Sequence, residues 1–196
     1  MIHFLFVTLP VLVILVLIPS FIYFYAIPLY KLSKTNPRPY TLWKKVRSLP
    51  LGNTILGTTL MHYLILFSSP YSASISPVID SMSVNSVQVS MNERFSVRNP
   101  FSSIHLAAII NLAEFAIGLN ISNQMHGVGK FIPTDLKVDF VKKARGRVSC
   151  TSVADVPTGP DNSNDKKATY QTEAEVKDSN NEVVAKVAVT WSLLFN

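Results

Sequence analysis

The residue with the clearest chemical potential in this 196-residue chain is Glu114, which lies in an apolar, alanine-rich stretch that closes near Gly118. Such a stretch predicts a helix that is apolar on almost every side and therefore buried. Burying a carboxylate without a partner costs free energy, so this glutamate indicates either acid–base or nucleophilic chemistry or a structural hydrogen bond. Asn111 lies three residues earlier on the same face, where its amide is placed to orient the carboxylate.

The beginning of the same helix offers hydrogen-bond donors. Asn99 and Pro100, followed by two serines, are typical of a helix entry, and Gly118 is typical of a helix end, so we expect a helix over about residues 101–118. The first N–H groups of a helix lack partners within the helix, and its dipole is positive at this end. A carbonyl oxygen that gains negative charge is stabilised by such an environment. His105 lies at this entry.

The surrounding elements are predicted to be strands, because apolar and polar residues alternate with a period of two. These segments comprise residues 83–99, 136–140, 148–156, 170–176 and 183–193. A polar loop at 157–168 and a tight turn at 178–181 separate the later ones. The order is one strand, a long helix, then four consecutive antiparallel strands. The helix is the only element long and apolar enough to cover one face of such a sheet, which predicts an α+β fold.

The N-terminal segment is predicted to be a single transmembrane helix. The run from Phe4 to Tyr30 has no charged side chain and exceeds the roughly 20 apolar residues that cross a bilayer. The positive-inside rule then places the N-terminus in a lumen or outside and the remainder in the cytoplasm, with a mitochondrial membrane as an alternative. A cleaved signal peptide is disfavoured by the missing basic n-region and the length of the run. Six basic residues and no acid follow within the first 50 positions: Lys31, Lys34, Arg38, Lys44, Lys45 and Arg47.

Charge and composition divide the chain into three regions. Beyond position 50 there are 12 basic and 12 acidic residues, so the net charge of +6 belongs to the N-terminal segment and gives no sign of a nucleic-acid-binding face. We expect a transmembrane anchor over residues 1–30, a basic connector with an accessory helix over 31–69, and the main domain over 70–196. The apolar run 54–67 is too short to span a membrane, which favours a buried helix over a re-entrant segment.

Several other site classes lack support in the sequence. The single cysteine, Cys150, excludes an internal disulfide, and its strand-like setting favours a buried thiol over a nucleophile. The four histidines show no metal-ligand spacing, so no metal site is predicted. No phosphate-binding loop or dinucleotide fingerprint is present.

With these elements in place, the sequence resembles the hotdog-fold acyl-CoA thioesterases, in particular their phenylacetate-type and DUF4442-like branch. Asn99, His105 and Glu114 fall at the spacing at which that family has an asparagine after a strand, a histidine-containing turn and an acidic residue on a helix. Residues 132–146 resemble the family's second strand and basic turn, and the resemblance spans roughly residues 40–194. It implies an antiparallel sheet wrapped around one long helix, hydrolysis of acyl-CoA, most simply fatty acyl-CoA, and no cofactor beyond the coenzyme A of the substrate.

The resemblance also implies roles for individual residues. Glu114 would be the nucleophile or general base, and the backbone amide of Leu106, helped by Asn99, would polarise the thioester carbonyl. Basic residues of the turn would bind the phosphates of coenzyme A, and these are Lys142, Lys143 and Arg145.

Structural alternatives stand beside these roles. Asn99 is also a good turn former, and His105 is equally consistent with a simple helix-entry residue. Glu114 could instead form a hydrogen bond across a dimer interface. The basic turn is equally consistent with a solvated surface. Ser102 replaces the glycine usual in the family's turn, and Leu106-Ala107 replaces its glycine pair. A non-catalytic module that binds acyl-CoA or lipid, or serves as a scaffold, is therefore the second hypothesis. A hydratase would need an Asp/His pair at another spacing.

The spacing of His105 and Glu114 constrains how one site is assembled. If both residues are fully helical, nine residues at about 100° each leave the two side chains about 180° apart, so they point to opposite faces. Hotdog dimers resolve this by presenting the carboxylate to the helix entry of the partner subunit. The sequence therefore predicts a composite site and a homodimer or a dimer of dimers.

Overall fold

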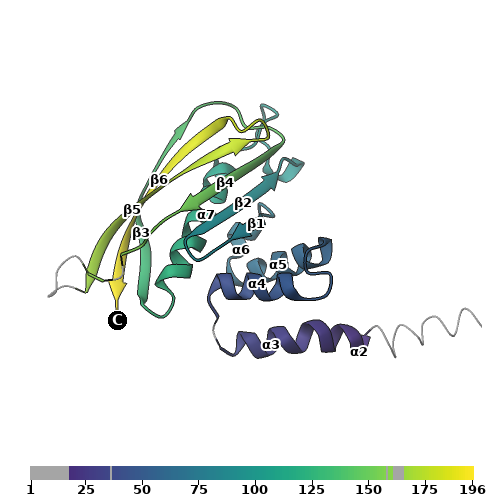
Figure 1. The fold of residues 1–196 in the computed structure, drawn as a ribbon. Coiled ribbons are helices and arrows are strands. Elements are labelled where there is room, and N and C mark those ends of the chain that lie inside the picture. Colours follow the sequence, from purple (N-terminus) through teal and green to yellow (C-terminus); the bar gives the residue numbers. More distant parts are fainter. Residues whose placement is uncertain (1–17, 36, 158, 161–165) are drawn as a thin grey trace, which may run out of the picture.

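The computed structural model describes residues 18–196 except 36, 158 and 161–165, and it shows one antiparallel sheet curved around a long helix (Figure 1). The sheet has six strands in the order β1-β2-β4-β5-β6-β3. This arrangement matches the predicted hotdog architecture. The strands are β1 (Val78–Met82), β2 (Ser86–Asn92), β3 (Gly129–Phe140), β4 (Arg147–Val153), β5 (Lys167–Asp178) and β6 (Val183–Phe195), and the long helix is α7 (Leu106–Met125).

The boundaries predicted for the central helix were wrong at both ends. The helix begins at Leu106 instead of about position 101, because the preceding residues form a hydrogen-bonded turn. It also continues past Gly118 for seven more residues. A glycine inside a helix costs about 1 kcal/mol relative to alanine, which the burial of the apolar helix readily exceeds.

Two strand predictions also need correction. Residues Phe95–Val97 form a short 3-10 helix, η3, where the continuation of a strand was expected. The sequence analysis missed β1, which pairs with β2 and has a register shift between Ile79 and Ser81. A bulge of this kind breaks the period of two from which a strand is predicted.

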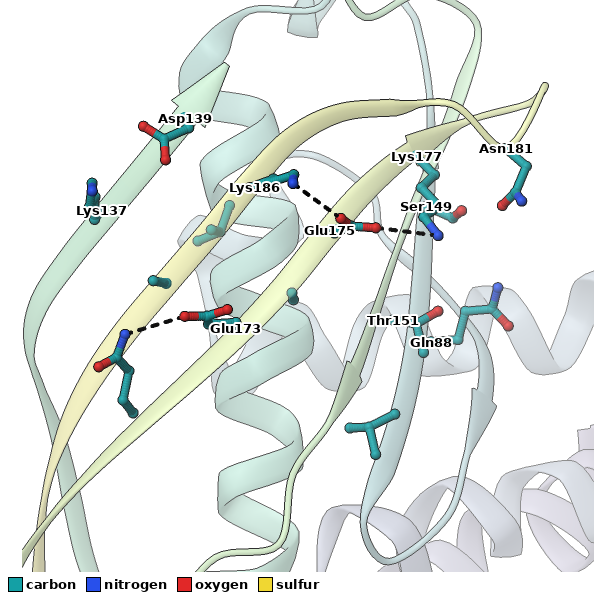
Figure 2. Close-up of a pocket in the computed structure, with 15 residues that line it drawn as sticks. Gln88, Lys137, Asp139, Ser149, Thr151, Glu173, Glu175, Lys177, Asn181 and Lys186 are labelled. Atoms are coloured by element: carbon teal, nitrogen blue, oxygen red, sulfur yellow. Dashed lines mark hydrogen bonds and ion pairs between the residues drawn. The ribbon is translucent and has the colours of Figure 1, made fainter. Parts of the chain in front are cut away.

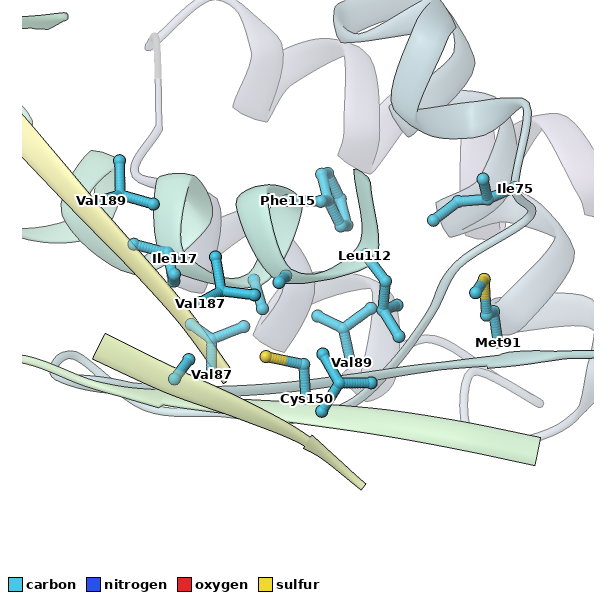
Figure 3. Close-up of a cluster of buried hydrophobic side chains, with 14 of the residues drawn as sticks. Ile75, Val87, Val89, Met91, Leu112, Phe115, Ile117, Cys150, Val187 and Val189 are labelled. Atoms are coloured by element: carbon cyan, nitrogen blue, oxygen red, sulfur yellow. The ribbon is translucent and has the colours of Figure 1, made fainter. Parts of the chain in front are cut away.

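The core lies between α7 and the inner face of the sheet (Figure 3). Leu112 and Ile117 on the helix, and Val89 and Val187 on the strands, are almost fully buried. Cys150 belongs to this cluster, as expected for a structural thiol. Burial raises the pKa of its thiol to about 12, so it is not a nucleophile at neutral pH.

Buried amides fix the position of α7 along the sheet. The Asn120 side chain, which is fully buried, donates hydrogen bonds to the carbonyls of Asn85 and Ser152, each at 3.1 Å. One turn later, the Gln124 side chain donates to the side-chain oxygen of Asn120 at 3.0 Å and to the backbone carbonyl of Ala154 at 2.7 Å. These bonds are directional, unlike apolar contacts, so they specify the height at which the helix lies.

The predicted connector is largely helical, and part of it belongs to the core. Val46, Met61 and Ile65 are buried with the residues of the main domain. Asn123 of α7 accepts a hydrogen bond from the Tyr40 amide at 2.7 Å and so caps a connector helix. The helices that precede the sheet are α2 (Ile18–Phe21), the π-helical turn η2 (Ile22–Ala26), α3 (Ile27–Ser33), α4 (Pro39–Ser48), α5 (Ile55–Ser68) and α6 (Pro70–Ala73).

The predicted membrane span falls partly outside the described residues. Within the described part, α7 is the one helix long and apolar enough to cross a bilayer, but most of it is buried as the core helix of this fold. Residues 18–33, which include the end of the predicted anchor, are helical. The Tyr25 hydroxyl in this segment donates a hydrogen bond to the Pro50 carbonyl. A transmembrane helix over residues 4–30 therefore stays a prediction.

Candidate functional site

A hollow of about 400 Å³ lies at the N-terminal end of α7. The loop that precedes the helix forms one wall, and the turn after β3 forms the other. The two are joined by a 2.9 Å hydrogen bond from the Ile104 amide to the Ala144 carbonyl. Five of the predicted site residues line the hollow, namely Asn99, His105, Leu106, Lys142 and Lys143. Glu114, Asn111 and Arg145 do not line it.

Asn99 organises the turn in front of the helix. The oxygen of its side-chain amide accepts hydrogen bonds from the backbone amides of Phe101 (3.0 Å) and Ser103 (3.2 Å). The NH₂ group of the same side chain donates to the Ser103 hydroxyl at 2.9 Å. This pattern is an Asx-type turn. The structure therefore favours the turn-forming alternative for Asn99, which also lines the hollow.

Ser102 has a backbone conformation that favours glycine. Its φ is 55°, in the left-handed region that costs a residue with a side chain roughly 1–2 kcal/mol. The turn therefore has a conformation that a glycine at this position would adopt without this cost.

The helix entry provides a free backbone amide at a residue that lines the hollow. The imidazole Nδ1 of His105 accepts a hydrogen bond from the Ala107 amide at 3.1 Å and caps the helix. A ring that accepts at Nδ1 carries its proton on Nε2, which remains available as a donor. The Leu106 amide makes no hydrogen bond to any of the described residues, and it lies at the positive end of the helix dipole.

Glu114 lies more than two turns along α7, away from the hollow. Its carboxylate makes no hydrogen bond or ion pair within the described part of the chain, and burial raises its pKa. Gly118 follows one turn later, and a Cβ there would lie 3.5 Å from a Glu114 carboxylate oxygen and 3.8 Å from the Trp191 ring. The glycine leaves space beside the carboxylate, which a side chain would occupy.

Asn111 does not hold the carboxylate as predicted. Its NH₂ group donates to the Tyr71 carbonyl at 3.1 Å, so the side chain faces α6 and ties it to α7. The carbonyl oxygen of Asn111 is buried without a partner among the described residues. The spacing on the helix predicted a contact with Glu114, whereas the hydrogen bond of the Asn111 side chain goes to the neighbouring helix.

The basic turn is divided between structural and free charges. Lys142 forms ion pairs with Asp178, at 2.7 Å, and with Glu182, and its hydrogen bond to Asp178 raises its pKa. These bonds hold the turn against the β5–β6 hairpin and occupy the charge expected to bind phosphate. Lys143 lines the hollow and has no ion pair in the described regions. Arg145 is exposed and lies outside the hollow.

The sequence analysis missed the apolar residues of the hollow. Phe101, Phe140 and Val141 line it and are 73%, 46% and 58% exposed. Their signal in the sequence was large apolar residues next to turn-forming and charged ones. They offer an apolar surface beside the free Leu106 amide, as a ligand with a carbonyl and an alkyl portion requires.

A larger hollow of about 590 Å³ lies on the outer face of the sheet (Figure 2). None of the predicted site residues lines it. Three of its charged side chains pair with one another, because Glu175 lies 3.4 Å from the Lys177 ammonium and 3.8 Å from that of Lys186. It lacks a free helix end or an apolar wall, so we place the candidate site at the entry of α7.

Replacing Ser102 by glycine is expected to stabilise the protein by up to about 1 kcal/mol. Glycine adopts a positive φ without steric cost, and this gain exceeds its greater entropy in the unfolded chain. Urea unfolding of the two proteins measures the difference. Ser102→Ala is the matched control and should give no gain, because alanine has the same steric cost as serine.

Replacing Glu114 by glutamine is expected to raise the stability at neutral pH. Because burial raises the pKa of Glu114, the folded protein keeps a proton that the unfolded chain has lost at the same pH. Wild-type stability therefore falls as the pH rises from the ordinary value of 4.5 through the raised value, and the variant escapes this loss. Thermal unfolding should give the variant the higher Tm at about pH 7 and similar values at about pH 4. An equal Tm difference at both pH values would contradict a desolvated carboxylate.

Comparisons with known proteins agree with this fold. A probable thioesterase from Pseudomonas aeruginosa has a TM-score of 0.63 and 20% identity, with 71% of this chain and 96% of that chain covered. A thioesterase variant from Staphylococcus aureus has a TM-score of 0.55 and 19% identity, over 64% and 99% of the two chains. A thioesterase from Haemophilus influenzae has a TM-score of 0.55 and 15% identity, over 69% and 88%.

No protein with a curated description matches the chain. The family model described as a domain of unknown function, DUF4442, matches residues 57–193, from the connector helix α5 to the last strand. That range includes the turn at Asn99, the whole of α7 and every strand of the sheet. The chain therefore belongs to the DUF4442 family, built on the hotdog fold.

Proposed function

We propose that this protein is a membrane-anchored thioesterase that hydrolyses acyl-CoA, most simply fatty acyl-CoA, at a site shared between two copies of the chain. The observation that carries the proposal is the free Leu106 amide at the head of α7, which lies in a hollow with apolar walls. A desolvated carboxylate, Glu114, lies on the same helix. A polarising donor and a base are the two groups that thioester hydrolysis needs.

The chemistry uses these groups in sequence. The thioester oxygen accepts a hydrogen bond from the Leu106 amide, with the Nε2–H of His105 as a second donor, so the carbonyl carbon becomes more electrophilic. Glu114 removes a proton from a water molecule, whose oxygen attacks that carbon. The C–S bond then breaks, and the thiolate of coenzyme A leaves and takes up a proton. Direct attack by the carboxylate, which gives an anhydride that water cleaves, is the other route.

A second copy of the chain is required because Glu114 does not reach the hollow of its own chain. The uncovered part of the fold supports pairing along the edge strand β3. Helix α7 packs mainly against β2 and β4 and less against β3. The exposed fractions of Ile132, Leu136 and Phe140 on β3 are 65%, 39% and 46%, which is unusual for apolar residues on a free edge.

The remaining parts of the proposal concern the two ends of the substrate. Lys143, beside the hollow, is the cation best placed for a phosphate of coenzyme A. The apolar residues 4–30 would anchor the chain with its N-terminus lumenal and its main domain cytoplasmic, close to lipid-derived acyl groups.

The S. aureus neighbour adds an indirect line of support. It has been crystallised as two single variants, one at a glutamine and one at a glutamate, and these positions are 15 residues apart. Asn99 and Glu114 are separated by the same interval in this chain. A polar side chain before the helix and a carboxylate within it are therefore a pair worth testing here.

Replacing Glu114 by glutamine is expected to lower turnover by roughly 100-fold or more, because the amide cannot take up a proton. Release of free thiol from acyl-CoA of several chain lengths measures it, with the full chain in detergent or vesicles. Glu173→Gln is the matched control, since Glu173 is exposed on the outer face of the sheet, and it should leave the rate unchanged. Saturable binding of acyl-CoA without turnover in the wild type would assign the protein to the non-catalytic alternative.

Replacing Leu106 by proline is expected to lower turnover by roughly 100-fold while the fold is kept. Proline removes the N–H and is well tolerated at the first position of a helix, and the ψ of 139° at His105 suits a residue before proline. Leu106→Ala is the matched control because it shortens the side chain and retains the amide. Equal losses in the two variants would show that the side chain, and not the amide, is required.

The same variants test the shared site. In dimers of one Glu114→Gln chain and one Leu106→Pro chain, one site combines an intact amide with an intact carboxylate from the other chain. An equal mixture should therefore recover about a quarter of the wild-type rate. A site contained in one chain predicts no recovery.

A further inference from the structure

Helix α5 is buried on one side and leaves a wholly uncharged apolar face uncovered on the other. Gly57, Met61 and Ile65 face the protein. On the opposite side, the exposed fractions are 83% for Ile55, 53% for Tyr63 and 84% for Phe67. We call this the outer face of α5. The sequence analysis expected a buried helix here, which holds for one side only.

The fold holds this face outward by a close backbone contact on the other side of the helix. A Cβ on Gly57 would lie 1.9 Å from the Gly52 carbonyl oxygen, so the helix packs directly against the connector loop. The Thr54 side chain caps the helix at its start by accepting from the Leu56 amide at 3.3 Å. The helix therefore cannot rotate about its axis to hide Phe67 without losing this contact.

The helical segment that precedes the sheet carries charges of one sign. The first acidic residue of the whole chain is Asp80, whereas six basic residues precede it. Lys44 and Lys45 are exposed on α4, which packs against α5, and Lys31 and Lys34 are exposed at the end of α3 and directly after it. A layer of helices that carries exposed apolar and aromatic side chains together with exposed lysines suits a bilayer with anionic lipids.

The apolar N-terminal segment enters the same layer of helices. Helices α3, α4 and α5 lie together beside the sheet domain (Figure 1). The Tyr25 hydroxyl donates a hydrogen bond to the Pro50 carbonyl. Pro50 lies three residues before Asn53, in the loop that leads into α5. The described end of the predicted anchor and the outer face of α5 are thus parts of one connected unit.

We infer that the outer face of α5 lies in the headgroup region of a bilayer, as a second membrane contact in addition to the predicted anchor. This contact would hold the domain against the membrane surface in one orientation. A second copy of the chain is a poorer occupant, because symmetric pairing through this face would bring two basic layers together without an acid among residues 1–79 of either. The contact concerns where the domain lies and does not depend on thioester hydrolysis.

Depth-dependent fluorescence quenching in proteoliposomes tests the contact with the full chain. Single variants Phe67→Trp and Ile55→Trp place a probe at each end of the outer face, and Val153→Trp, on the outer surface of the sheet, is the matched control. The vesicles contain an anionic phospholipid and a phospholipid brominated on its acyl chains. The signal of the unsubstituted chain, from Trp43 and Trp191, is subtracted.

Both outer-face probes should be quenched about twofold or more beyond the control, because bromine quenches only tryptophan that reaches the acyl region. Quenching no greater than the control at either position would overturn the inference and leave the domain held away from the bilayer. Sedimentation of Phe67→Glu in detergent gives the second measurement. An oligomer unchanged from the wild type supports a lipid contact, and loss of the oligomer would assign the face to a second copy instead.

Discussion

The position of α7 inside the sheet is the constraint on which the rest of the molecule depends. This 20-residue apolar helix is buried within the core, but apolar contacts alone would allow it to slide. The hydrogen bonds of Asn120 to the carbonyls of Asn85 and Ser152 remove that freedom. They lie at the C-terminal half of the helix, so they set the height of the N-terminal half, where the hollow and the free Leu106 amide are found.

Two features of the site are unfavourable for folding, and both lie on or next to this helix. Ser102 holds a left-handed backbone conformation, and the carboxylate of Glu114 is desolvated without a partner in the described residues. Neither improves packing, so a purely structural account of the helix leaves them unexplained. The proposed reaction would use both, since the turn borders the hollow beside the free amide and desolvation makes a carboxylate a better base.

Elements with a long, regular pattern could be predicted from the sequence, and those fixed by tertiary contacts could not. The alternation in β6 and the apolar character of α7 identify both elements. The bulge at Ile79–Ser81 concealed β1, and Gly118 resembles a helix end although it lies within a buried helix. For the candidate site, the resemblance to the hotdog thioesterases predicted the position at the helix entry, where the structure has a hollow. The attachment of Asn111 to Tyr71 depends on α6 and has no local signal.

The same reasoning connects the raised pKa of Glu114 with the need for a second copy. In one chain the carboxylate lies on a desolvated face and meets no positive group, which favours its neutral form. The entry of a partner's α7 would bring a free amide and the positive end of a helix dipole to that face, and both favour the charged form. A carboxylate that is poorly satisfied in the monomer is then stabilised only where the hollow of a partner is present. Under the proposed dimeric site, assembly and activation of the base would thus be one event, and the pairing would supply the partner that Glu114 lacks among the described residues.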